Sequence, residues 1–158
     1  MSDEVSMEEQ GSMVVEFLDG LVASYGLTGT ASVTSIDDDV IDVAIAGDGL
    51  GVLIGPGGHT LSALGEVSKT ELQRRLGGTA KCRVRVDVGG YRETRRDALV
   101  TFTGEVAEKV RDTGAPHALE PMSSIDRKIV HDAVGELDGV DSTSDGEEPR
   151  RRVVIVPA

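Results

Sequence analysis

Residues 51–61 read GVLIGPGGHTL, a glycine-rich turn between two apolar runs, which predicts a helix, a tight turn and a second helix. Glycine tolerates a positive φ and, because it has no Cβ, lets a ligand approach the backbone. The N-terminus of the following helix adds unpaired N–H groups and a partial positive charge. The stretch is therefore a candidate site for a phosphate group.

Two common phosphate-binding loops do not fit these residues. A Walker loop ends in Gly-Lys followed by Ser or Thr, but no lysine precedes Lys69. A dinucleotide fingerprint starting at Gly55 and Gly57 would need glycine at Thr60, and it would follow a strand. What remains is Ile-Gly-x-x-Gly-x-x-Leu at residues 54–61, which resembles the loop of a KH nucleic-acid-binding domain. Taken alone, a plain turn between helices is an equal alternative.

Length and composition restrict the class of protein. At 158 residues the chain can form two small domains, and its single cysteine, Cys82, excludes an internal disulfide and a cysteine-based metal site. No apolar run approaches the roughly 20 residues of a membrane helix. The acidic N-terminus lacks the positive region of a secretory signal. We therefore expect a cytoplasmic protein with no cofactor, no metal and no membrane insertion.

The net charge of −12 argues against a nucleic-acid ligand, because phosphate binding depends on Lys and Arg. The charge is unevenly distributed, however. Residues 1–68 contain 12 acidic and no basic residues, whereas residues 69–111 contain 11 basic and 6 acidic residues. Distant charges count little when the screening length is ~8 Å. The basic segment is therefore either a local binding surface or an ordinary solvated face.

The N-terminal half predicts one small domain over residues 12–90. Residues 1–11 lack periodicity and predict a flexible acidic tail, so that Ser12 would cap the first helix. The predicted elements are a helix from Ser12 to Gly26, a hairpin over 31–46, a helix over 58–76 with Val67 among its inward residues, and a strand over 82–88 with Cys82 facing the core. This α-β-β-α-turn-α-β order is the type II arrangement of a KH domain.

The C-terminal half, residues 91–158, predicts helices and a small β-sheet. A helix over 91–111 has Phe102 among its inward residues and carries Arg92, Arg95 and Arg96 on one side of its first turns. Cations at a helix start oppose the macrodipole, so a binding role is a reasonable explanation for them. A short extended piece at 118–120, a helix over 125–137 and a hairpin turning near Asp145-Gly146 follow.

The helix over 125–137 places Arg127 and His131 four residues apart, hence on one face. An arginine can bind a phosphate with two hydrogen bonds, and an imidazole can hydrogen-bond or stack on a base. An exposed polar pair is the alternative when this spacing is taken alone. Followed by its hairpin, the helix resembles the RxxxH domain, which is named for this pair and binds single-stranded nucleic acid.

The order of both modules resembles the bacterial Jag family of sporulation-associated KH plus RxxxH proteins. Four stretches carry the resemblance: GYR at 90–92, LEPM at 119–122, DRKIVH at 126–131 and SDGEEPR at 144–150. The two loop-centre positions, which commonly include Lys or Arg in KH domains, are Pro56 and Gly57 here. The separate N-terminal Jag domain of some members has no counterpart in this sequence, so we expect no function that depends on it.

The resemblance implies an α+β fold of two domains and a non-catalytic protein that binds single-stranded RNA, with single-stranded DNA as an alternative ligand. It also implies a smaller KH protein as a partner and a regulatory link to cell elongation or division. Glu147 and Glu148 would orient nearby arginines or backbone. The candidate nucleic-acid-binding residues are Gly55, Pro56, Gly57, Gly58, His59, Arg92, Arg95, Arg96, Arg127, His131, Arg150, Arg151 and Arg152.

Two other classes of function stay open on the sequence. A protein-interaction adaptor would use the acidic first half to dock a partner and would have lost most RNA contact. A small hydrolase based on His131 and a glutamate has no nucleophile arranged beside it. RNA binding is the preferred hypothesis, and the scarcity of aromatic residues indicates modest affinity.

Overall fold

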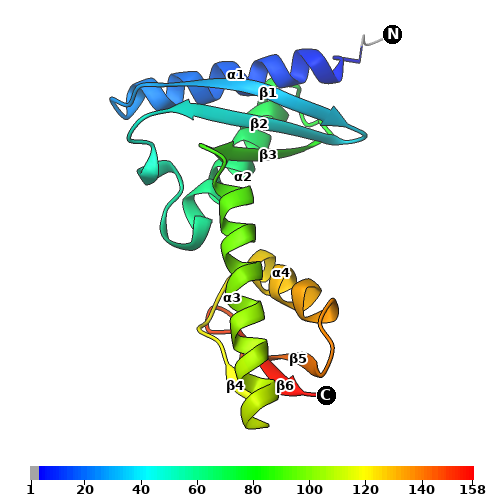
Figure 1. The fold of residues 1–158 in the computed structure, drawn as a ribbon. Helices are drawn as coiled ribbons and strands as arrows, with labels where there is room; N and C mark the ends of the chain where they lie inside the picture. Colours follow the sequence, from blue (N-terminus) through cyan, green and yellow to red (C-terminus); the bar gives the residue numbers. More distant parts are fainter. Residues whose placement is uncertain (1–3) are drawn as a thin grey trace. The chain divides into compact units, whose positions relative to one another are not determined.

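The computed structural model describes residues 4–158, and the chain divides into two compact units. The N-terminal unit ends at Tyr91, and the C-terminal unit comprises Arg92–Ala158. Each has its own mixed helices and strands and its own hydrophobic core (Figure 1). The predicted α+β class with two small domains is confirmed. No helix among the described residues is long and apolar enough to cross a membrane.

The first helix, α1 (Met7–Ser24), begins five residues before the predicted start. Ser6 is the N-cap, because its side chain accepts from the Glu9 amide while the Glu9 carboxylate accepts from the Ser6 amide. Ser12 lies inside the helix, where its hydroxyl donates to the Glu8 carbonyl. The predicted tail over residues 1–11 is therefore wrong from Met7 onward, and residues 1–3 lie outside the described part.

A three-stranded sheet forms the centre of the N-terminal unit. The hairpin of β1 (Gly29–Asp37) and β2 (Val40–Gly47) is antiparallel, and β3 (Arg83–Val88) pairs with β2 in parallel, giving the order β1-β2-β3. Apolar residues alternate with polar ones along β2 and β3, as a half-buried sheet requires. One face is therefore buried and the other is polar.

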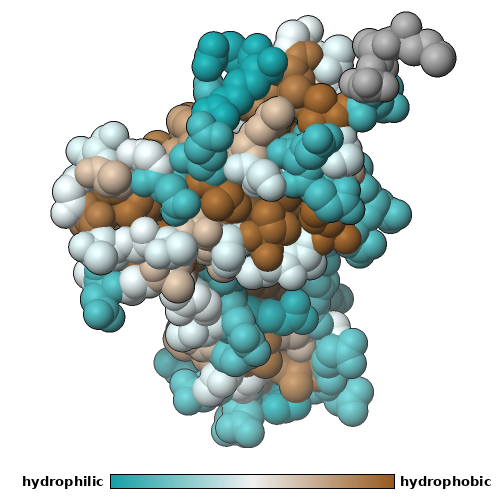
Figure 2. All heavy atoms as spheres, turned by 90° about the horizontal axis from the view of Figure 1, so that it is seen from above, coloured by the Kyte–Doolittle hydropathy of each residue, from teal (hydrophilic) through white to brown (hydrophobic). Residues whose placement is uncertain are grey.

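The helices α1 and α2 (His59–Arg75) cover the buried face of this sheet (Figure 1). The core includes the fully buried Leu18, Ile41, Ile45 and Leu61, and Cys82 is buried as predicted. Val67 is 48% exposed, so its predicted inward position is wrong. Seen from the side of α1, Figure 2 shows apolar atoms in a band between hydrophilic groups.

Two short 3₁₀ turns connect β2 to α2: η1 (Gly51–Leu53) and η2 (Pro56–Gly58). The first of the two helices predicted around the glycine turn is thus a single 3₁₀ turn rather than an α-helix. Otherwise the element order agrees with the predicted type II arrangement.

The C-terminal unit packs two helices on a second small sheet. Its elements are α3 (Tyr91–Thr113), β4 (His117–Ala118), α4 (Ser124–Gly135), β5 (Val140–Asp145) and β6 (Arg152–Pro157). The strand order is β4-β6-β5, with both pairs antiparallel. The core contains Val110, Val130, Val153 and Ile155. Phe102, predicted to face inward, is 45% exposed.

Candidate nucleic-acid interface

The glycine loop requires glycine at specific positions. Gly55, Gly57 and Gly58 have φ values of 71°, 60° and 76°, which favour glycine. A Cβ at residue 55 would lie 2.2 Å from Oγ1 of Thr60, and one at residue 58 would lie 3.1 Å from the Tyr91 ring. Of these three glycines, only Gly57 has open space around it. The loop is therefore a tightly built turn with one exposed, unobstructed glycine.

Most backbone amides of the loop are used inside it. The Gly55 amide donates to the Gly51 carbonyl at 3.3 Å, and the Gly58 amide donates to the Gly55 carbonyl at 3.2 Å. The His59 amide donates to the Pro56 carbonyl, and Pro56 itself has no N–H. Of the four predicted loop positions, Gly57 alone has an amide with no acceptor among residues 4–158. The centre of the loop can therefore offer one backbone donor to a ligand.

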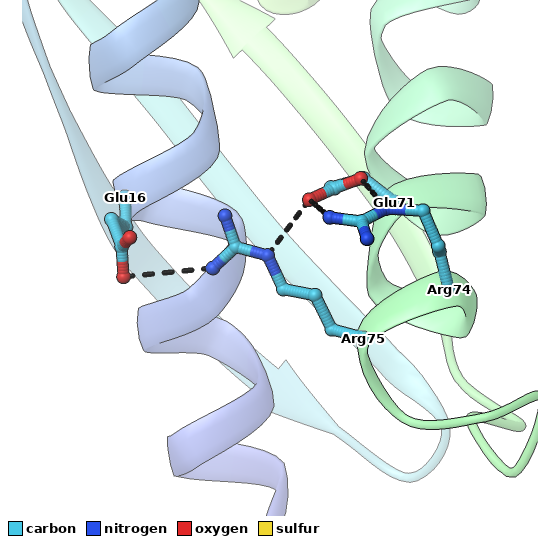
Figure 3. Close-up of polar contacts among 4 residues, drawn as sticks. All are labelled: Glu16, Glu71, Arg74 and Arg75. Carbon is cyan, nitrogen blue, oxygen red and sulfur yellow. Dashed lines mark hydrogen bonds and ion pairs between the residues drawn. The ribbon is translucent and has the colours of Figure 1, made fainter.

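The arginines at the end of α2 lie away from this loop. Arg74 and Arg75 occupy the last turn of the helix, sixteen residues from His59, which corresponds to about 24 Å along the helix. Both donate to Glu71, and Arg75 also lies 3.5 Å from Glu16 of α1 (Figure 3). These hydrogen bonds lower the pKa of Glu71 to about 2. The cluster stabilises the helix end and its packing on α1 rather than charging the loop.

The arginines of β3 are also paired, on the polar face of the sheet. Arg85 donates to both carboxylate oxygens of Asp42, and this contact raises the pKa of Arg85 above its ordinary value. Arg83 donates to Asp39 at 3.2 Å. The basic segment over 69–111 is therefore divided among separate ion pairs within the N-terminal unit instead of forming one patch beside the loop.

In the C-terminal unit, Arg127 is anchored inside the fold. Its side chain is 10% exposed, and its Nη1 donates to the Met122 carbonyl at 2.7 Å while its Nη2 donates to the Glu148 carboxylate. The expectation that Glu148 orients a nearby arginine agrees with this contact. Both terminal nitrogens of the guanidinium thus have protein partners, on the segment before α4 and on the turn between β5 and β6.

His131 lies on the same face of α4, as its spacing from Arg127 predicted, and is half-buried. Its Nδ1 is 2.7 Å from Oγ of Ser142, and its Nε2 is 2.8 Å from Oγ of Ser144. A neutral imidazole donates through one nitrogen and accepts through the other, and a hydroxyl can fill either role. His131 therefore connects α4 to two successive inward positions of β5.

The three arginines after the turn differ in their surroundings. Arg150 is exposed, and its guanidinium has no partner within residues 4–158. Arg151 is half-buried and closes the turn by donating to the Gly146 carbonyl at 3.0 Å. Arg152 is exposed and donates to Asp145 at 3.3 Å. Two of the three cations therefore reach solvent at the end of the hairpin.

The three arginines at the start of α3 also separate. Arg95 donates to the buried carboxylate of Asp126 at 3.0 Å and so joins α3 to the start of α4. Arg92 is half-buried, whereas Arg96 is exposed and has no ion-pair partner within the described chain. Arg96 is the cation of this group that is available to a ligand.

The structure brings Arg127, His131 and the hairpin together but leaves the glycine loop in the other unit. The sequence interpretation missed the partners Met122, Ser142 and Ser144. The period-two spacing of the two serines on β5 was a usable signal, because residues 142 and 144 share the face of the buried Val140. Among the described residues, no group of three His, Cys, Asp or Glu side chains is arranged to hold a metal ion.

Comparisons with known proteins agree with the geometry of the C-terminal unit. Residues 98–157 match the RxxxH (R-three-H) domain family, whose arginine and histidine correspond to Arg127 and His131. The chain is 33% identical over 142 residues to the RNA-binding protein KhpB of Clostridium symbiosum, covering 89% of this chain and 63% of that protein. It is 37% identical over 105 residues to KhpB of Streptococcus pneumoniae serotype 2, covering 66% and 31%, and 34% identical over 113 residues to KhpB of Bacillus subtilis, covering 70% and 53%.

The chain thus spans less than two-thirds of the length of these relatives. The first match nevertheless extends across both compact units rather than the RxxxH domain alone. The chain therefore belongs to the Jag-like proteins that contain an RxxxH domain.

Proposed function

We propose that this chain binds single-stranded RNA without catalysing a reaction, using the Gly55–Gly58 loop of one unit and the RxxxH hairpin surface of the other. The observation that carries the proposal is the match to a protein named for RNA binding, which covers 89% of this chain and therefore both units. The whole-chain relationship supports a shared ligand class.

The loop supports contact with a sugar-phosphate backbone rather than with bases. The Gly57 amide is an open donor just before a 17-residue helix, whose dipole favours an anion at this end. Neither Pro56 nor Gly57 brings a charged side chain, so the contact at the centre of the loop is weak. Backbone contacts carry no sequence information, so this part of the site would tolerate many RNA sequences.

The RxxxH unit supplies the positive charge in the proposal. Arg150 and Arg152 at the hairpin end and Arg96 on α3 are exposed, so each can approach a phosphate. Arg127 and His131 belong to this half of the site through the hairpin that they hold. Binding that depends on such cations weakens as salt rises, by about 0.7 in the slope of log K against log salt for each single-strand phosphate contact.

Titration of a fluorescein-labelled oligo(U) RNA at several salt concentrations tests the loop. The Gly57→Asp variant places a carboxylate at the open amide, and aspartate tolerates the positive φ better than most residues. The expected loss of affinity is about tenfold, which is the size of one charge-assisted hydrogen bond. Gly77→Asp is the matched control, because Gly77 has the same φ of 60° and open space but lies beyond the far end of α2.

Equal affinity of the two aspartate variants would remove the loop from the binding site. An unlabelled oligo(dT) competitor distinguishes RNA from single-stranded DNA, and a duplex competitor tests the preference for single strands. Complete absence of salt-sensitive binding by the unmodified chain would contradict the proposal as a whole.

The resemblance to the Jag family extends this proposal to a post-transcriptional role linked to cell elongation or division and to a smaller KH protein as a partner. Crosslinking in cells followed by sequencing of the bound RNA tests the regulatory role. Transcripts for cell-wall growth or division proteins are the expected result, and ribosomal RNA alone would contradict it.

A second candidate function is a protein-interaction adaptor that uses the N-terminal unit. It is favoured by exposed apolar residues there, since Val52 is 61% exposed beside the loop and Val67 is 48% exposed on α2. The face in Figure 2 carries further apolar surface. A complex that survives nuclease treatment and is lost with Val52→Ser or Val67→Ser would support this function.

A further inference from the structure

We infer that Arg127 and His131 are positioning residues that fix the β5–β6 hairpin on α4, and that Arg150 and Arg152 of this hairpin contact the RNA phosphates. The inference rests on the proposed RNA binding and assigns the direct contacts within it. It also means that the two signature residues of the RxxxH unit act through the hairpin rather than on the ligand.

The first observation is that Arg127 is committed to the protein. With a side chain 10% exposed and both terminal nitrogens bonded to Met122 and Glu148, its guanidinium would have to leave these partners to reach a phosphate. Breaking such a pair leaves an unpaired group in a largely buried place, which is costly. An arginine placed in this way serves better as an anchor than as a ligand contact.

The second observation is that the partners of Arg127 form a closed set of hydrogen bonds around the turn. The Met122 carbonyl accepts from Arg127, and the Met122 amide donates to the Arg151 carbonyl at 3.1 Å. Glu148 lies in the same turn and accepts from Arg127. Arg127 therefore holds the turn at Glu148 directly and at Arg151 through Met122.

Within the turn itself, two bonds fix the backbone that carries the cations. The Arg150 amide donates to the Glu147 carbonyl at 2.8 Å, and the Arg151 guanidinium donates to the Gly146 carbonyl at 3.0 Å. His131 fixes the other strand of the hairpin through Ser142 and Ser144. The hairpin end is thus ordered before any ligand binds, which lowers the entropic cost of binding.

The third observation is that the cations left exposed are those of the hairpin. Arg150 has no partner for its guanidinium within residues 4–158. The Arg152–Asp145 pair is solvent-exposed, with side chains 45% and 61% accessible, so a phosphate can replace Asp145 at little cost. These two groups are therefore available in the same small segment that Arg127 and His131 hold.

Truncation of Glu148 separates positioning from direct contact, because the two roles predict opposite signs. If Arg127 bound a phosphate, Glu148→Ala would release its guanidinium and remove a competing carboxylate, so affinity for labelled oligo(U) RNA would rise. If Arg127 positions the turn, Glu148→Ala loosens the hairpin end and affinity falls. We expect a loss of about two- to tenfold, the size of ordering one or two side chains on binding.

Glu147→Ala is the matched control, since it removes the same charge from the neighbouring residue, whose backbone carbonyl rather than its carboxylate holds the turn. We expect this variant to bind RNA as well as the unmodified chain or slightly better. A structural readout accompanies it: hydrogen exchange of the Met122 and Arg150 amides should become faster in Glu148→Ala and stay unchanged in Glu147→Ala. Tighter or equal binding by Glu148→Ala overturns the positioning role.

The direct contacts are tested separately with Arg150→Gln and Arg152→Gln, which alter exposed side chains and leave the anchors intact. Each should lower the salt slope by about 0.7, whereas Lys128→Gln, which removes an exposed cation from α4, should not. Unchanged slopes for both arginine variants overturn the inference. Because the unmodified chain is measured alongside, failure of RNA binding itself is distinguished from failure of this assignment.

Discussion

Gly58 and Tyr91 lie so close together that a Cβ at residue 58 would stand 3.1 Å from Cε1 of the tyrosine ring. Gly58 also has a φ of 76°, so the residue is restricted both by its backbone and by its neighbour. We expect Gly58→Ala to lower the free energy of unfolding by about 2–4 kcal/mol, combining left-handed strain with displacement of the ring.

Gly57→Ala is the control for this prediction, because Gly57 has a φ of 60° but a methyl group there would meet nothing closer than 3.8 Å. It should cost only the backbone strain of about 1–2 kcal/mol. Urea denaturation of both variants measures the difference. Equal losses would show that Tyr91 accommodates a methyl group without strain.

The start of α1 gives a second prediction. Ser6→Ala removes the side-chain acceptor of the capping box and should destabilise the chain by about 1 kcal/mol. Ser12→Ala lies inside the helix, where alanine is the better helix former, so its effect should be near zero or slightly stabilising. Thermal unfolding of the two variants distinguishes this helix start from one at Ser12, for which the order of the effects would be reversed.

The same helix shows why the sequence interpretation failed there. The pattern Ser6-x-x-Glu9 is a capping-box signature, but acidic composition and the absence of apolar periodicity favoured a tail. The first turn is instead stabilised by its cap and by acidic residues at the helix N-terminus, Glu8 and Glu9. Local capping outweighed composition.

Other features were predictable because they depend on short-range pattern. The hairpin turn before Val40 and the inward position of Cys82 followed from turn residues and period-two alternation. The exposures of Val67 and Phe102 did not, because helical periodicity identifies an apolar stripe but not how far its flanks are covered by other elements.

For the candidate site, sequence spacing placed Arg127 and His131 on one face of a helix but could not indicate what that face meets. The partners of Arg127 lie 5 and 21 residues away, at Met122 and Glu148. The loop amides show the same limit, since the acceptors of Gly55 and Gly58 are carbonyls within the turn itself. Burial and backbone pairing are properties of the folded chain, so a site predicted from residue types overestimates its free donors.

Cys82 gives a third prediction. Its side chain is 2% exposed, its Sγ lies 3.3 Å from Oε1 of Gln10, and burial raises the pKa of the thiol. The thiolate is the reactive form, so a thiol reagent at pH 8 should modify the folded chain at least roughly tenfold more slowly than the urea-unfolded chain. Thr79→Cys in a Cys82→Ala background supplies an exposed thiol in the same segment as the control. Equal rates for the two folded thiols would contradict the buried position.

The cluster in Figure 3 predicts a specific pH dependence of stability. Hydrogen bonds from Arg74 and Arg75 lower the pKa of Glu71 from its ordinary value of 4.5 to about 2. A carboxyl group whose pKa is lower in the folded state binds fewer protons there, so its stabilising contribution is present above about pH 4.5 and is lost as the pH falls toward 2. Glu71→Gln should therefore reduce the unfolding free energy at pH 7, and the difference from the unmodified chain should shrink steadily over that acidic interval. Glu66→Gln on the same helix carries the same charge change without these arginines, and its difference should stay nearly constant. Urea denaturation from pH 7 to pH 2 measures both, and a Glu71→Gln difference that does not depend on pH would show that the arginines do not hold the carboxylate in the ionised form.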